Sequence, residues 1–172
     1  PHLEEAMADS GETVLLAVLE PDGLHFTYID SVESPESVRY SVAIGTRRPL
    51  YATSCGRLFL AHQTETMRQA YYKAVDMREV TDKTITKPEA LEKRLAQIRD
   101  AGISVTLGDY SVDVAGFATP IFNSDGKMIA ALAIGVPVSR GVREEARFRE
   151  VAIQSARSIS NVFGYTEDPT AH

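Results

Sequence analysis

The first quarter of the chain carries three apolar patterns that predict strands. Residues 14–19 form a continuous apolar run of the length of a buried strand. After the turn tripeptide at 21–23, the segment 26–32 predicts its partner in a hairpin. Apolar residues then alternate with polar or small ones over 38–44, which predicts a third strand with one buried face.

Helical patterns occupy the middle of the chain. Residues 58–61 predict a short buried helix that starts near Thr53, and residues 67–75 predict a second one with Thr64 or Thr66 as its cap. The clearest helix start is the sequence 86–89, Thr-Lys-Pro-Glu, because Thr and Glu at this spacing can each satisfy a free amide of the first turn. Gly102 is typical of the left-handed residue that ends such a helix.

The last third predicts strands and a long helix. Strands are expected at 103–107 and 115–122, and a tight turn at 123–126 leads into a third strand at 127–136. Apolar residues spaced by three and four predict one helix over 142–163. This order of elements favours the α+β class, with an antiparallel sheet covered by helices.

Length and composition fit one domain over residues 1–172. The chain is 44% hydrophobic and 24% charged, as ordinary globular proteins are. Its 18 basic and 24 acidic residues give a net charge of −6, which argues against nucleic-acid binding by this stretch alone. The longest apolar run, 128–138, is shorter than the roughly 20 residues of a membrane helix. Because the chain starts at Pro1 inside an amphipathic segment, we expect a fragment of a longer protein. Its single cysteine fits a reducing compartment, so we expect that protein to be cytoplasmic.

Candidates for catalysis or metal binding are few. The four histidines lie far apart and form no ligand pair, so we expect no metal site and no cofactor. The single cysteine, Cys55, excludes an internal disulfide. Its place at a helix start could lower the pKa of the thiol, but a small buried residue is the favoured interpretation. No nucleophile-elbow, P-loop or dinucleotide-binding motif is present, so the sequence does not predict an enzyme.

Two features permit a ligand site, and each has a structural alternative. The helix start at 53–57 offers unpaired amides, and Gly56 would let an anion approach the backbone; the alternative is an ordinary capped helix packed on the sheet. In the strand 127–136 the even positions are mostly bulky, whereas the odd positions shrink from Ile129 to Gly135. A row of small side chains either admits a close-packed helix or leaves a hollow for a ligand.

Several motifs together resemble the C-terminal effector-binding domain of the IclR family of bacterial transcription regulators. The segment 45–57, GTRRPLYATSCGR, is similar to the family's G-x-x-x-P-L-H-A-x-x-x-G-K. The segments 95–102, 117–126 and 130–140 resemble its L-x-x-I-R-x-x-G, I-A-x-P-I-F-D-x-x-G and A-A-L-S-I-x-G-P-x-x-R motifs in the same order. The resemblance implies a GAF-like fold, in which a central antiparallel sheet is flanked by helices on both faces.

The resemblance also implies partners. Such regulators contact operator DNA through an N-terminal winged helix-turn-helix domain, which is absent from this sequence. They associate as homodimers or homotetramers, bind a small organic effector in the C-terminal domain, and use no membrane partner.

Carried over residue by residue, the resemblance places the effector site at the helix start and on the neighbouring strands. The expected effector-binding residues are Tyr40, Val42, Ser54, Cys55, Gly56, Thr106, Asp109, Gly116, Phe117, Ala133 and Gly135. Several positions that are polar in the family are small or apolar here, among them Gly116, Ala133 and Gly135. We therefore expect a carboxylate that is bulkier or more aromatic than pyruvate or glyoxylate. Its carboxylate would meet the amides of residues 54–56, and its remainder would lie beside the small residues and pack on Tyr40, Val42 and Phe117.

Two other functions remain open at this point. A GAF-like redox enzyme could use Cys55, although the chain has no second cysteine to resolve an oxidised thiol. Alternatively, the domain could serve only for oligomerisation, with its cavity filled by its own side chains.

Overall fold

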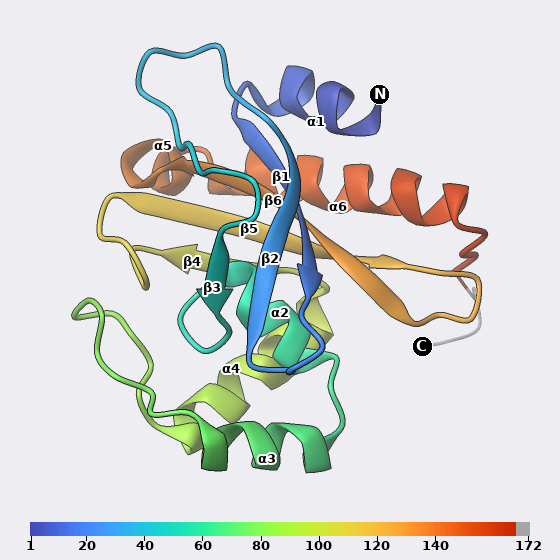
Figure 1. Cartoon of the computed structure of the whole chain (residues 1–172). Coiled ribbons are helices and arrows are strands. Elements are labelled where there is room, and N and C mark those ends of the chain that lie inside the picture. The colour runs from blue at the N-terminus through green and yellow to red at the C-terminus, as the bar shows by residue number, and fades with distance from the viewer. Residues whose placement is uncertain (168–172) are drawn as a thin grey trace.

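The computed structural model describes residues 1–167 and shows one six-stranded antiparallel sheet with helices on both faces (Figure 1). The strand order is β3-β2-β1-β6-β5-β4. The strands are β1 Thr13–Leu19, β2 His25–Val32, β3 Arg47–Pro49, β4 Ser104–Leu107, β5 Val114–Phe122 and β6 Met128–Pro137. This arrangement confirms the predicted α+β class with helices on both faces of the sheet.

One face of the sheet is covered by α1 (His2–Ser10), α5 (Val138–Arg143) and α6 (Glu145–Val162). The bulky even positions of β6 lie in this core, among them the fully buried Leu132 and Ile134. Phe117 of β5 packs there against Phe148 of α6, with ring centroids 5.5 Å apart. The bulky side chains of β6 therefore anchor α6, as the sequence pattern predicted.

The opposite face is covered by α2 (Ser54–Ala61), which packs on the sheet, and by α4 (Pro88–Ala101), which packs on α2. The third helix of this layer is α3 (Glu65–Ala74). All eight residues of α2 are buried, so this helix is the centre of the layer. Ala131 of β6 is also fully buried in this core, because a small side chain lets α2 approach the sheet.

The strand predicted over 38–44 does not form, and residues 33–46 are irregular instead. Tyr40 and Val42 pack against the core, whereas Val38 and Ile44, which occupy equivalent positions of the alternation, are exposed. Only the middle of the predicted strand therefore has a buried face. Chain pairing resumes at β3, whose three residues pair with the start of β2. The left-handed Gly45 (φ 87°) makes the turn that returns the chain to β2.

Helix ends follow the predictions in part. Thr53 caps α2 by accepting from the Gly56 amide, and Thr64 caps α3. The expected capping box at Thr86 is wrong: Lys87 is the N-cap of α4, and the helix start relies on Pro88 in its first turn. The helix predicted over 142–163 is two helices, α5 and α6, because the chain leaves helical geometry at Glu144 (φ −119°, ψ 26°).

Within residues 1–167, the structure contains no helix that combines the length and the apolar character required to cross a membrane. His172 lies outside the described residues.

Candidate functional site

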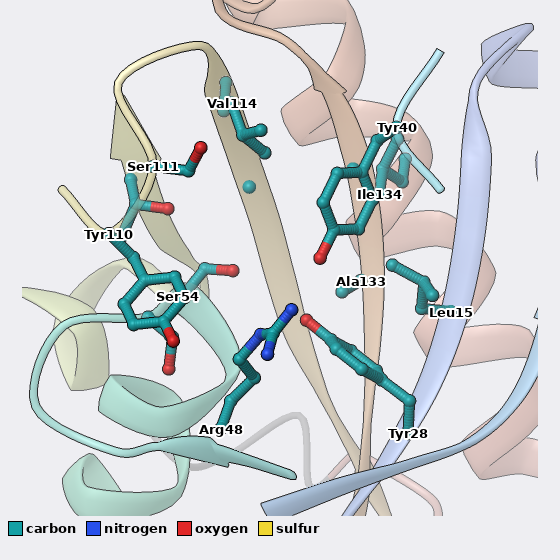
Figure 2. A pocket seen from close by; sticks show the side chains of 15 residues that line it. Leu15, Tyr28, Tyr40, Arg48, Ser54, Tyr110, Ser111, Val114, Ala133 and Ile134 are labelled. Carbon is teal, nitrogen blue, oxygen red and sulfur yellow. The ribbon is translucent and has the colours of Figure 1, made fainter. Parts of the chain in front are cut away.

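A cavity of about 260 Å³ lies between the sheet and the start of α2 (Figure 2). The sheet supplies its floor, the start of α2 one wall, and Tyr40 of the irregular 33–46 segment another. The residues that line it are Leu15, Tyr28, Tyr40, Arg48, Thr53, Ser54, Thr106, Tyr110, Ser111, Val114, Ala115, Gly116, Ala133, Ile134 and Gly135.

Two paired glycines shape the floor. Gly116 of β5 lies directly opposite Gly135 of β6 in the register of the sheet. A Cβ atom on Gly135 would overlap the ring of Tyr40, and a Cβ atom on Gly116 would lie 2.5 Å from the Oγ of Ser54. The absence of side chains therefore allows Tyr40 and Ser54 to close down on the sheet beside Ala133. The small-residue stripe of β6 serves both predicted purposes, since Ala131 admits α2 whereas Ala133 and Gly135 line a hollow.

Arg48 brings a positive charge to the cavity. Its guanidinium carbon lies 5.4 Å from the centroid of the Tyr110 ring, a cation–π distance. Figure 2 shows this guanidinium and the hydroxyl groups of Tyr28 and Tyr40 pointing toward the same space. Between residues 1 and 167, no carboxylate lies within ion-pair distance of Arg48. Arg48 is not among the residues predicted from the sequence, because no local pattern distinguishes it from the adjacent Arg47.

The phenols of Tyr28 and Tyr40 are neutral at physiological pH. Burial raises the pKa of Tyr28 well above its ordinary value, and the neighbouring Cys55 and Tyr40 raise it further. Burial also raises the pKa of Tyr40, against the opposing effect of Arg48. Both hydroxyls therefore keep their protons and can donate hydrogen bonds to a ligand.

Of the eleven site residues predicted from the sequence, the structure brings six to the cavity. These are Tyr40, Ser54, Thr106, Gly116, Ala133 and Gly135. The other five, Val42, Cys55, Gly56, Asp109 and Phe117, do not line it.

Phe117 and Val42 pack elsewhere. The side chain of Phe117 lies on the opposite face of the sheet from the cavity, because successive residues of a strand point to opposite faces and Gly116 faces the cavity. Val42 packs at the edge of the core around α2. The expectation that a ligand packs on these two side chains is therefore corrected.

Asp109 is held in a buried ion pair. Its Oδ2 accepts from Arg57 Nη1 at 2.8 Å, and its Oδ1 accepts from the Leu107 amide at 2.9 Å. The Arg57 side chain is fully buried, and its Nε donates to the carbonyl of Tyr51 at 2.7 Å. Burial lowers the pKa of Arg57, and the Asp109 charge opposes that effect. The ion pair ties the loop after β4, which carries Tyr110 and Ser111 of the cavity wall, to α2.

Cys55 has none of the properties of a reactive thiol. Its side chain is fully buried in the core under α2, and burial raises its pKa to about 12. The thiol therefore stays protonated at neutral pH, in contrast to the low-pKa thiolates of redox sites.

The helix-start amides are only partly free. Gly56 donates its amide to the Thr53 hydroxyl at 3.2 Å, and its Cα faces the backbone of Leu50, so no ligand can approach there. Within the described part of the chain, the amides of Ser54 and Cys55 have no acceptor, as expected for the first turn of a helix. Of the three predicted donors, only the Ser54 amide both lacks an acceptor in the described residues and belongs to a residue that lines the cavity.

Among the described residues, one cluster has the spacing of a metal site, namely Glu20, Asp22 and His25. Arg47 already donates to Glu20 at 2.6 Å and to Asp22 at 3.2 Å, and none of the three residues lines the cavity. The cluster is a surface ion-pair network around Arg47.

Comparison with known proteins identifies the family. Residues 1–161 match the family model described as bacterial transcriptional regulator IclR, C-terminal. The transcriptional repressor IclR of Escherichia coli is 29% identical over 95% of this chain. The chain spans 60% of the length of that relative.

Solved structures agree with this match. The IclR of Thermotoga maritima is 30% identical, with a TM-score of 0.87 over 95% of this chain and 66% of its own. An IclR homologue from Microbacterium hydrocarbonoxydans, solved in complex with 4-hydroxybenzoate, is 29% identical, with a TM-score of 0.84 over 96% of this chain and 66% of its own. Motif order, family model and fold lead to the same conclusion: the chain belongs to the IclR family of bacterial transcriptional regulators and spans the family's C-terminal domain.

Proposed function

We propose that this domain is the ligand sensor of an IclR-type regulator and that it binds a small organic carboxylate in the cavity. The observation that carries the proposal is a hollow on the α2 side of the sheet, floored by Gly116 and Gly135 and bordered by hydroxyl groups and one arginine. Concave sites with a few polar groups among apolar walls are the usual form of small-molecule sites. The 4-hydroxybenzoate bound by the Microbacterium homologue supports a ligand of this size and chemistry.

The volume of the cavity indicates how large a ligand it can hold. A volume of about 260 Å³ corresponds to about nine water molecules at roughly 30 Å³ each. Covalently bonded atoms pack more closely than liquid water, so the cavity has room for at least about nine non-hydrogen atoms. Pyruvate and glyoxylate are smaller than this, which favours the bulkier carboxylate expected from the sequence.

Regulation would follow from linkage between this site and DNA binding. A ligand shifts an oligomer's arrangement only by binding one arrangement more tightly than another. Typical coupling free energies of about 1–3 kcal/mol change operator affinity roughly 5- to 150-fold. In this proposal the full-length regulator is a cytoplasmic homodimer or homotetramer, and it contacts operator DNA through its N-terminal domain.

The two other candidate functions have less support. A redox enzyme would need a reactive Cys55, whereas burial raises the pKa of this thiol. A purely oligomerising domain would be expected to have a filled cavity, whereas Ala133, Gly116 and Gly135 border open volume.

A thermal-shift screen of aromatic and aliphatic carboxylates tests the proposal. A ligand at 100 times its Kd stabilises the folded state by about 2.7 kcal/mol. For a chain of this length, that corresponds to a rise in Tm of about 5–11 °C. If no small molecule of the panel raises Tm, the oligomerising function takes precedence.

Two variants then locate the site. Gly135→Leu should abolish the ligand-induced shift and also lower the unliganded Tm, because its side chain collides with the Tyr40 ring. Ala133→Leu should abolish the shift without that collision, because it extends into open volume. Ligand affinity that survives both substitutions would place the ligand outside the cavity. Far-UV circular dichroism of both variants serves as the control for folding.

A further inference from the structure

Arg48 is the one charged residue among those that line the cavity. The other lining residues are apolar or carry neutral hydroxyl groups, and no acidic residue is among them. The guanidinium group presents a planar set of hydrogen-bond donors that matches a carboxylate. This half-buried guanidinium has no carboxylate partner among residues 1–167, so it can form a charge-assisted pair with an anionic ligand.

The neighbouring Arg47 shows that this arrangement is specific to position 48. Both residues lie on β3, and successive side chains of a strand point to opposite sides. Arg47 points outward and bonds Glu20 at 2.7 and 2.6 Å, with Asp22 at 3.2 Å. Arg48 points into the cavity, where its guanidinium stands over Tyr110. Arg47 is therefore neutralised by Glu20 and Asp22, whereas Arg48 faces the cavity.

The surroundings of Arg48 favour a flat ligand. Three tyrosines, Tyr28, Tyr40 and Tyr110, line the same cavity, and aromatic rings prefer stacked or edge-to-face contact with other rings. The hydroxyl groups of Tyr28 and Tyr40 point to the space in front of the guanidinium (Figure 2), where they can donate to the same anion.

A second polar group of the ligand has partners across the sheet. Thr106 comes from β4, at the other end of the strand order from β3, and Ser54 comes from the start of α2. The Oγ of Ser54 and the Oγ1 of Thr106 converge on Gly116. These hydroxyls are neutral, so they suit a hydroxyl or similar uncharged group and not a second carboxylate.

We infer that the ligand is a planar aromatic monoanion whose carboxylate pairs with Arg48 and whose uncharged hydrogen-bonding substituent faces Ser54 and Thr106. This inference rests on the proposed sensor function and deepens it. It also reverses the orientation expected from the sequence, in which the carboxylate met the start of α2. Because Arg48 supplies one positive charge, the cavity should bind a monoanion more tightly than a neutral analogue or a dianion.

Calorimetric titration of the chain with three probes tests the inference. The probes are 4-hydroxybenzoate, its neutral isostere 4-hydroxybenzamide, and the non-planar cyclohexanecarboxylate. A charge-assisted hydrogen bond corresponds to a preference for the acid over the amide of about 10- to 150-fold in Kd. In Arg48→Gln the affinity for 4-hydroxybenzoate should fall by the same factor, and the preference for the acid over the amide should disappear.

Matched variants separate charge from folding. Arg47→Gln removes the adjacent arginine, which points away from the cavity, and should leave all three affinities unchanged. Arg48→Lys should restore part of the preference for the acid. Because Arg48 has no ion-pair partner in residues 1–167, its removal leaves no buried charge uncompensated, and the Tm of Arg48→Gln should stay close to that of the parent chain.

Two outcomes overturn the inference. A preference for the acid that is unchanged in Arg48→Gln would place the carboxylate elsewhere, with the amide of Ser54 as the remaining donor at the start of α2. If the parent chain binds neither 4-hydroxybenzoate nor 4-hydroxybenzamide, the ligand class is wrong. If the chain instead binds aliphatic acids, and Ala133→Leu abolishes that binding, the sensor function stands although the inferred ligand class is wrong. This outcome distinguishes failure of the inference from failure of the proposed function.

Discussion

Removing the charge of Arg57 should destabilise the domain more than most single substitutions. This guanidinium is fully buried, and its partner Asp109 has a side chain only 11% exposed. In Arg57→Met the Asp109 carboxylate keeps the Leu107 amide as a donor but loses its counter-charge. Breaking a buried pair from one side costs about 3–5 kcal/mol, because the remaining charge is uncompensated.

The assay is urea unfolding followed by circular dichroism, with linear extrapolation to water. A loss of about 3–5 kcal/mol corresponds to a fall in Tm of about 6–20 °C for a chain of this length. Arg57→Lys keeps the charge and removes the Nη2 atom, which has no hydrogen-bond partner among the described residues, but it loses the bond from Nε to the Tyr51 carbonyl. Its cost should therefore be clearly smaller, on the order of 1 kcal/mol.

A double-mutant cycle isolates the pair itself. Asp109→Asn should be destabilising because it leaves the Arg57 charge alone in the core, whereas the double variant Arg57→Met with Asp109→Asn should lose much less than the sum. We expect a coupling free energy of at least about 1.5 kcal/mol. Additive losses, or a cost for Arg57→Met below about 1 kcal/mol, would refute the assignment of Asp109 as the structural partner of Arg57 and return it to the candidate ligand contacts.

Three further predictions concern other parts of the domain. Because burial raises the pKa of Cys55 to about 12, its alkylation by iodoacetamide at pH 8 should be at least about a thousandfold slower in the folded than in the unfolded chain; comparable rates would revive the redox function. Thr53→Ala should lower the unfolding free energy by about 1 kcal/mol through loss of the α2 cap, whereas Thr53→Ser should not; equal losses would point to packing of the methyl group instead. Glu12→Gln should weaken the bidentate pair with Arg140, which also holds the 33–46 segment by donating to a carbonyl of that segment, and hydrogen exchange around Tyr40 should accelerate; unchanged exchange would show that the segment is held by other contacts.

Local periodicity predicted the fold closely where neighbouring residues alone decide the structure. The hairpin of β1 and β2, the strand β6 and the left-handed end of α4 at Gly102 (φ 68°) follow the patterns along the chain. The pattern over 38–44 failed because alternation shows only that side chains point to two sides, and a strand also needs a partner chain to bond. The single helix predicted over 142–163 was wrong because the backbone leaves helical geometry at Glu144, where α5 ends and α6 begins.

The residues of the candidate site also fall into those that the sequence predicted and those that it did not. The small residues Ala133 and Gly135 permitted a hollow or a close-packed helix, and the resemblance added Gly116; all three line the cavity. Asp109 was expected to contact the ligand because the resemblance to the family places an acidic residue there. Its partner in the structure, Arg57, lies 52 positions away in sequence. Arg48 escaped attention because two adjacent arginines look alike until the sheet places them on opposite sides.

By itself, the sequence determined the family, the α+β class, the core face of β6 and six residues of the cavity wall. Only the tertiary structure decided which charges meet in the interior: Arg57 with Asp109 under α2, and Arg48 alone in the cavity. The physical reason is that the cost of a buried charge depends on the groups that surround it in space. Those groups arrive from elements far apart along the chain, so no local pattern can report whether a charge is satisfied or still free to bind a ligand.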